Sequence, residues 1–235
     1  MRRFFKQVSV RPANRGYAVF LDGRPLKNMA DGREFSLPSQ ALAGFIAEEW
    51  SAAGEEFDLT SMPASRLTMG AMALKDADRE AVVSKLIDAA KNDTLCFFAP
   101  YPEALTKRQE ECWRPLIDRM NDRGCAFEPT RNLSPPPLAE STREFLKNEM
   151  RRADNIPLAC LQVLSGVFGS VILAFAVREG DLTAKEAFEA SCLEELFQND
   201  LWHTDEEALT ARQNRERDAC LAAKVLHLYE GRKNG

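Results

Sequence analysis

Carboxylates gather between residues 194 and 207, where their spacing suits either a binding surface or acid–base chemistry. On a helix that starts at Thr183, a rotation of 100° per residue places Glu195 between Phe188 and Ser191, on a mostly apolar face. A buried carboxylate is costly unless it is paired, hydrogen-bonded or protonated. The pattern therefore predicts that Glu195 has a specific partner.

The sequence leaves two interpretations of Glu195 open. In the first, it forms an internal ion pair with an arginine such as Arg66 or Arg108. In the second, it is a partner-binding charge at the edge of an apolar surface. The acidic neighbours Glu194, Asp200, Asp205, Glu206 and Glu207 support the second interpretation without displacing the first. An alternative function is a small enzyme whose acidic site consists of Glu194, Glu195 and Asp205, and it requires these carboxylates to converge in a closed pocket.

Other catalytic chemistry finds little support. His203 and His227 have no neighbours at the spacing of metal ligands or of a catalytic triad. Neither a dinucleotide-binding glycine motif nor a phosphate-binding loop occurs. The six cysteines are scattered without a CxxC pair, which indicates a reducing compartment. We therefore expect no cofactor, no metal and no enzymatic activity.

Composition narrows the class of partner. The 235-residue chain has a net charge of -5, and its aromatic residues are not interleaved with a basic patch. Nucleic acid is therefore not an expected partner. Two arginines and two phenylalanines follow the first methionine, but the polar residues Lys6 and Gln7 come before an apolar secretory region can form. We accordingly expect no signal peptide.

The first sixty residues predict a small β-rich module. Val8 and Val10 alternate with polar residues, residues 17–21 are β-prone, and Asp22-Gly23 is a preferred hairpin turn before residues 24–27. Residues 35–37 add a short strand. One helix then begins at Pro38 and Ser39, and its apolar face holds Leu42, Phe45, Ile46 and Trp50.

From residue 61 onward the pattern is helical. We expect helices near residues 64–75, 77–91, 103–122, 140–152, 156–179, 183–198 and 204–227. Three pairs have the capping-box spacing, namely Ser141 with Glu144, Thr183 with Glu186, and Thr204 with Glu207. Gly124 and Gly180 lie just after helices, as stop signals do. The fold class is thus α+β, with a β-rich domain over residues 1–60 and an all-α domain over residues 61–235.

The run from Ile156 to Val177 contains no formal charge and is long enough for a membrane span of roughly 20 residues. It is nevertheless the only such run, and its neighbours are amphipathic helices that need an apolar partner. We therefore expect no membrane insertion and predict a buried central helix for the second domain. Gly166, Ser170 and Ala174 would give that helix a smooth packing face.

A series of short motifs resembles the assembly chaperones of ATP synthase that act on the α subunit of its catalytic head. In chain order, the matching residues are Arg3-Phe4-Phe5-Lys6, Leu21-Asp22-Gly23-Arg24-Pro25, Leu37-Pro38, Ala47-Glu48-Glu49-Trp50, Met62-Pro63, Arg66-Leu67, Asp93-Thr94-Leu95-Cys96, Arg108-Gln109, Trp113, Pro115-Leu116, Gly169-Ser170-Val171-Ile172-Leu173-Ala174, Glu194-Glu195, Gln198, Trp202 and Asp205-Glu206-Glu207-Ala208. The resemblance runs from about Arg3 to Leu226. It departs from the family at Asn28-Met29, where a Thr-Pro pair is usual, at His203, where glycine is usual, and near Pro135, where a Gln-Pro pair is usual.

The resemblance implies a chaperone that binds the newly made α subunit and shields its assembly surface until the β subunit replaces it. It also implies a small β-rich domain followed by a helical domain. We expect the client-binding surface to include Glu194, Glu195, Gln198, Trp202, Asp205, Glu207 and Arg66. We further expect a monomer when free, in the bacterial cytoplasm, or in the mitochondrial matrix if a presequence has been removed.

Overall fold

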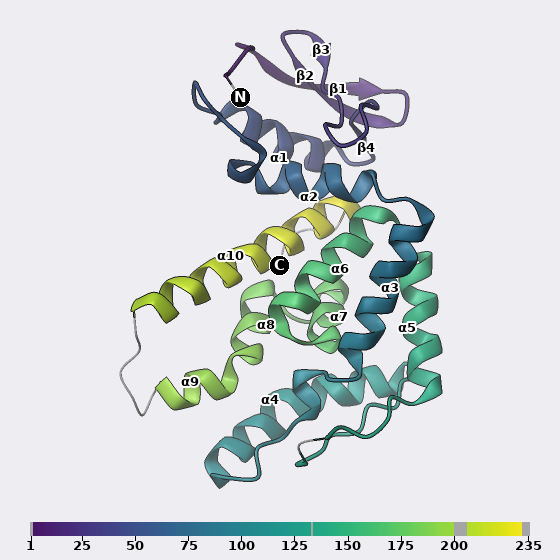
Figure 1. The fold of residues 1–235 in the computed structure, drawn as a ribbon, viewed down its shortest axis with the longest axis vertical. Helices are drawn as coiled ribbons and strands as arrows, with labels where there is room; N and C mark the ends of the chain where they lie inside the picture. The colour runs from purple at the N-terminus through teal and green to yellow at the C-terminus, as the bar shows by residue number, and fades with distance from the viewer. Residues whose placement is uncertain (1, 133, 200–205, 232–235) are drawn as a thin grey trace.

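The computed structural model describes residues 2–132, 134–199 and 206–231. Figure 1 shows a small sheet and helix α1 at one end of the molecule, with the remaining helices stacked beyond α2. One hydrophobic core of buried residues runs through both parts. The expected α+β class, with the sheet first and the helices after it, is confirmed. The domain boundary at residue 60 stays a prediction.

The sheet is antiparallel and is centred on its second strand. Strand β2 (Gly16–Leu21) pairs with β1 (Val8–Ala13) along one edge and with β3 (Arg24–Pro25) and β4 (Ser36–Leu37) along the other. The turn between β2 and β3 has φ angles of 47° at Asp22 and 79° at Gly23, the left-handed backbone that this dipeptide tolerates. The predicted hairpin and short fourth strand are confirmed.

Helix α1 (Gln40–Ser51) connects the part that contains the sheet to the helices that follow, through side chains near its C-terminal end. Its N-cap Ser39 accepts a hydrogen bond from the backbone N–H of Leu42, as the sequence predicts. At its other end, Trp50 is fully buried and its indole N–H donates to Ser65 Oγ at 3.1 Å. The Glu49 carboxylate accepts from the backbone N–H of Ser65 at 2.8 Å. A carboxylate at a helix start is favourable, so α1 fixes the first turn of α2 (Pro63–Met72).

The larger part consists of helices, and the longest connection between them is the segment from α4 to α5. Their bounds are α3 Asp76–Ala90, α4 Glu103–Asp122, α5 Glu140–Arg152, α6 Asn155–Phe168, α7 Val171–Glu179, α8 Ala184–Ser191, α9 Leu193–Asn199 and α10 Glu206–Glu230, with short 3-10 turns at Leu59–Ser61 and Thr94–Cys96. Most expected helices are present within a few residues. Two were wrong as single helices, because the run 156–179 is divided into α6 and α7, and the run 183–198 into α8 and α9.

The capping-box predictions had different outcomes. Thr183 and Glu186 form both reciprocal bonds at the start of α8, so this prediction is confirmed. The prediction for Ser141 was wrong, because α5 already begins at Glu140 and the Glu144 carboxylate pairs instead with Lys147 at 3.2 Å. Thr204 lies outside the described residues.

A buried carboxylate explains why the uncharged run is broken. Gly169 has a φ of 62°, and α7 starts two residues later. Asp93, which is fully buried, accepts from the backbone N–H groups of Val171 at 2.7 Å and Ile172 at 3.0 Å. These N–H groups would otherwise be unsatisfied at the helix start. Burial raises the pKa of Asp93 from 3.8 to about 6, although the hydrogen bonds that it accepts act in the opposite direction.

The prediction that residues 156–177 lie in the interior is confirmed for most of the run, although these residues form two helices and not one. Residues Val171–Val177 are all buried, and α6 contacts α2, α3, α7 and α10. The predicted packing face was wrong, because Gly166 is exposed and Ser170 caps α7 by accepting from the Leu173 N–H at 3.0 Å. Within the described residues, no helix has the length and apolar character required to cross a membrane.

Candidate functional site

The acidic segment lies on two helices that diverge. Figure 1 shows α9 beside α4 in the part of the molecule away from the sheet, while α10 extends towards α2. A break at Cys192 separates α8 from α9, so the helical rotation counted from Thr183 does not continue to Glu195. Glu195 is therefore not on the buried face, and 38% of its side chain is exposed.

Glu195 forms ion pairs with helix α10. Its carboxylate lies 3.2 Å from Arg215 and 3.9 Å from Arg212. The Arg215 guanidinium also lies 5.6 Å from the ring centroid of Phe188 on α8. Glu195 thus forms an ion pair, but the prediction of Arg66 or Arg108 as its partner was wrong. The arginines that lie within reach are Arg212 and Arg215 of α10.

Glu194 is held from the other side. Its carboxylate accepts from the side-chain amide of Gln109 on α4 at 2.7 Å, and Gln109 is fully buried. The other end of this amide accepts from the backbone N–H of Ala99 at 2.8 Å. Adjacent residues on a helix point about 100° apart. The pair Glu194 and Glu195 therefore ties α9 to α4 and to α10 at once.

The sequence reasoning did not identify Gln109 as part of the site. A signal was present, because Gln109 lies four residues after Leu105 and four before Trp113, and all three are buried on α4. A polar residue on an apolar stripe requires hydrogen-bond partners. Trp113 strengthens the same corner, since its indole N–H donates to the backbone carbonyl of Ala190 at 2.9 Å.

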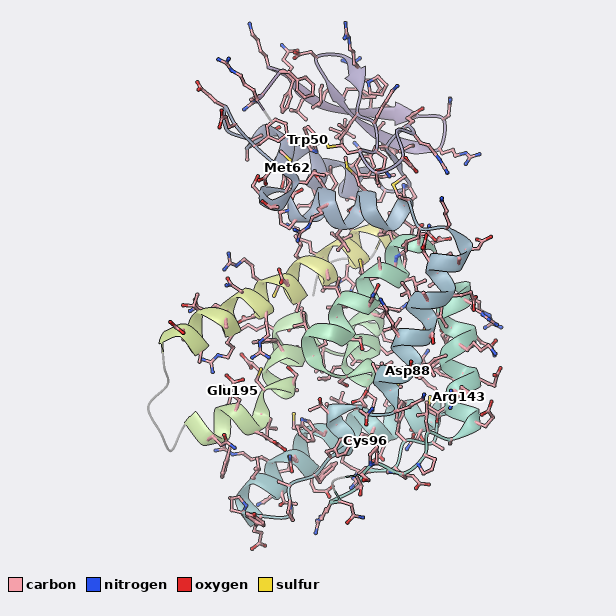
Figure 2. The ribbon with its side chains drawn as sticks, in the orientation of Figure 1. Trp50, Met62, Asp88, Cys96, Arg143 and Glu195 are labelled. Carbon is pink, nitrogen blue, oxygen red and sulfur yellow. The ribbon has the colours of Figure 1, made fainter. Side chains whose placement is uncertain are left out.

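The remaining predicted site residues are not all brought together. Gln198 on α9 and Glu207 on α10 are exposed. Trp202 and Asp205 lie outside the described residues. Arg66 is exposed on α2, and Figure 2 shows Met62, just before α2, far from Glu195. Arg66 is thus separate from the acidic residues of α9.

Near the acidic face, Arg108 of α4 stacks on α9. Its guanidinium lies 5.3 Å from the ring centroid of Phe197. A cation over an aromatic ring is attracted to the negative face of that ring. Arg108, like Gln109 beside it, therefore supports α9 without pairing with Glu195.

Most groups that could serve as nucleophiles or bases are buried, although the thiol of Cys220 is exposed. Among the described residues, no cluster of three or more histidine, cysteine or acidic side chains is placed to hold a metal ion. All six cysteines are free thiols, and burial raises the pKa of Cys125 to about 11 and that of Cys96 still further. The buried His227 ring lies 2.9 Å from the backbone carbonyl of Val177. The described charged groups of this region are Glu194 and Glu195 with the residues that hold them, Gln109, Arg212 and Arg215.

Comparison with known proteins gives a consistent set of relatives. A family model described as ATP12 chaperone protein matches residues 2–121. The mitochondrial protein atp12 of Schizosaccharomyces pombe is 24% identical over 222 residues, which cover 88% of this chain and 75% of the fungal one. The crystal structure of Atp12 from Paracoccus denitrificans superposes with a TM-score of 0.89 at 34% identity, over 97% of this chain and 98% of that one. A structure from Agrobacterium tumefaciens has a TM-score of 0.87 at 33% identity, over 96% of this chain and 85% of the other.

Proposed function

The chain belongs to the ATP12 chaperone family, and we propose that it binds the unassembled α subunit of ATP synthase and shields its assembly surface. The observation that carries this proposal is the agreement of the family match with a structural likeness over nearly the whole chain. A chaperone of this kind needs no nucleotide site, because the β subunit can displace it by binding the same surface more tightly. A monomeric free state and a cytoplasmic location stay predictions.

We propose that the client-binding face consists of α9 and the start of α10. Glu194, Gln198 and Glu207 are exposed there, and Leu209 adds an apolar side chain that is 38% exposed. Carboxylates around an apolar patch suit a client surface that carries arginines. Trp202 and Asp205 lie between α9 and α10 in the sequence, and we propose that they belong to the same face. Arg66, on the distant α2, is proposed as a separate contact.

The alternative of a small enzyme is less well supported by the geometry. Its site requires Glu194 and Glu195 to converge, yet Glu194 binds Gln109 on α4 whereas Glu195 binds Arg215 on α10. The third member of that site, Asp205, lies outside the described residues. That the protein has no enzymatic activity stays a prediction.

Aggregation of isolated α subunit tests the proposal directly. Light scattering of α subunit diluted from denaturant is followed with and without an equal concentration of this protein. We expect suppression by the wild type, because the exposed assembly surface would be covered. A folded sample that leaves the scattering unchanged refutes the chaperone function for this chain.

Glu195→Gln tests the proposed face in the same assay. We expect weaker suppression, with a thermal midpoint lowered by no more than about 4 °C, because a half-exposed ion pair contributes about 0–1 kcal/mol. Glu189→Gln is the matched control, since Glu189 is exposed on α8 outside the face. Equal activity of the two variants argues against Glu195 as a client contact, whereas a much larger loss of stability indicates a purely structural ion pair.

A further inference from the structure

Charge is divided unevenly along this acidic protein. Residues 1–37, which form the sheet, contain eight lysines and arginines against three acidic residues, a net charge of +5. Because the whole chain has a net charge of -5, the other 198 residues carry -10. The sheet is therefore a basic module on an acidic body, and a local field of this kind attracts acidic partners.

Most of the positive charge on this module has no carboxylate partner. Within residues 2–37, the described ion pair is the one between Arg33 and Asp31 at 3.4 Å. Arg24 and Lys27 are exposed and form no ion pair with any residue that the structure describes. In the helical part, by contrast, Arg119, Arg123 and Arg151 all pair with carboxylates of other helices or turns.

The two unpaired cations lie on a groove that is partly apolar. The groove has a volume of about 720 Å³ and is lined by Phe4, Phe5, Leu21, Asp22, Arg24, Pro25, Leu26 and Lys27. Phe4 is 69% exposed, although its ring meets Phe5 edge-on at 5.4 Å between centroids. An aromatic side chain this exposed beside unpaired cations is typical of a recognition surface.

Asp22, the one carboxylate among the described residues that line the groove, is already engaged. Asp22 accepts from the backbone N–H groups of Gln7 at 2.7 Å and Lys6 at 3.0 Å. These bonds hold the pKa of Asp22 below its ordinary value, so the side chain stays ionised with its oxygens directed at the backbone. Asp22 thus fixes the wall of the groove and leaves Arg24 and Lys27 available.

We propose that this basic groove binds an extended acidic segment of the client that carries an aromatic or aliphatic residue. Client carboxylates would pair with Arg24 and Lys27, while the apolar residue would pack on Phe4 and Pro25. Figure 1 shows α9 well separated from the sheet, so the two surfaces would hold a client at two separate points. The identity of the partner rests on the proposed function, whereas the chemistry of the groove does not.

A labelled peptide tests the groove independently of the client. A fluorescein-labelled hexapeptide of repeated Glu-Glu-Phe is titrated with the full chain at low salt, and binding is read by fluorescence anisotropy. We expect saturable binding that a Lys-Lys-Phe peptide does not show, because the groove selects negative charge. Failure of the wild type to bind the acidic peptide, or equal binding of both peptides, overturns the proposal.

Charge reversal locates the binding. Arg24→Glu combined with Lys27→Glu is expected to weaken acidic-peptide binding at least about tenfold and to reduce its salt dependence. The matched control is Arg11→Glu with Arg15→Glu, which makes the same change in net charge on exposed residues of the same module outside the groove. Equal weakening by both double variants would indicate only the general field and would overturn the assignment to the groove.

Phe4→Ala tests the apolar contact. We expect it to weaken peptide binding several-fold, whereas Tyr101→Ala, which removes an aromatic side chain that is 78% exposed elsewhere, leaves binding unchanged. The same variants are then tested for binding to isolated α subunit. If the groove variants bind the peptide weakly but the α subunit normally, the groove is not a client surface. If wild-type protein binds the peptide but not the α subunit, the proposed function fails while the groove stands.

Discussion

Replacing Asp93 with alanine tests the central structural feature of the helical domain. The carboxylate accepts three backbone N–H bonds, from Leu95 at 3.1 Å, Val171 at 2.7 Å and Ile172 at 3.0 Å. Leaving a buried donor without an acceptor costs about 1–3 kcal/mol. Using the lower end for all three donors, because removal of a buried charge offsets part of the loss, Asp93→Ala should lower the free energy of unfolding at pH 7 by about 3 kcal/mol.

Urea unfolding followed by circular dichroism under reducing conditions measures this loss. A decrease of about 3 kcal/mol corresponds to a thermal midpoint about 6–12 °C lower in a domain of this size. Asp88→Ala is the control, since Asp88 is exposed and the partner of its side chain among the described residues is the nearby Lys91, and we expect a change within about 0.5 kcal/mol. A loss at Asp93 no larger than at Asp88 would show that the start of α7 needs no carboxylate.

The pH dependence separates the effect of burial from that of the hydrogen bonds. The pKa of Asp93 is about 6 in the folded state against an ordinary value of 3.8, so between these values the folded protein binds more protons than the unfolded chain. The contribution of Asp93 to stability therefore falls as the pH rises from about 4 to 6, by about 3 kcal/mol. The stability gap between wild type and Asp93→Ala should accordingly narrow from pH 4 to pH 7. A gap that widens over this range would mean that the folded pKa is lowered, and would refute the dominance of burial.

Two further substitutions test other joints of the fold. Gly169→Ala should lower the free energy of unfolding by about 2 kcal/mol, because Gly169 has a φ of 62° and an added Cβ would lie 2.7 Å from Thr94 Oγ1. In a double-mutant cycle measured by urea unfolding, adding Thr94→Ala should recover part of that loss. Gly44→Ala is the control, because nothing lies within 4 Å of its added Cβ, and we expect the free energy of unfolding to rise by about 0.5–1 kcal/mol. If the losses caused by Gly169→Ala and Thr94→Ala simply add in the double variant, the contact between the two residues is not supported. Trp50→Phe should lower the thermal midpoint by about 4 °C or more, since it removes the indole bond to Ser65 and leaves unfilled volume between α1 and α2; an unchanged midpoint in calorimetry would mean that this bond does not stabilise the junction.

Local signals explain which parts of the fold were predictable. The hairpin follows from Asp22-Gly23, whose backbone tolerates positive φ, and the start of α8 follows from a capping box complete within four residues. The burial of residues 171–177 follows from their lack of charge. The face of α9 was not predictable in this way, because the break at Cys192 changes the rotation of every residue after it.

The sequence by itself determined the family, the order of the elements and the chain segments that must be buried, because these follow from short motifs, their order and the local periodicity of the chain. Only the tertiary structure decided the partners of the buried and half-buried charges. Asp93 caps a helix 78 residues further on, and Glu195 pairs with an arginine 20 residues away on α10 instead of with Arg66 or Arg108. The physical reason is that a carboxylate is stabilised by whichever donors the packing of helices brings within about 3 Å, and that packing is set by the whole core.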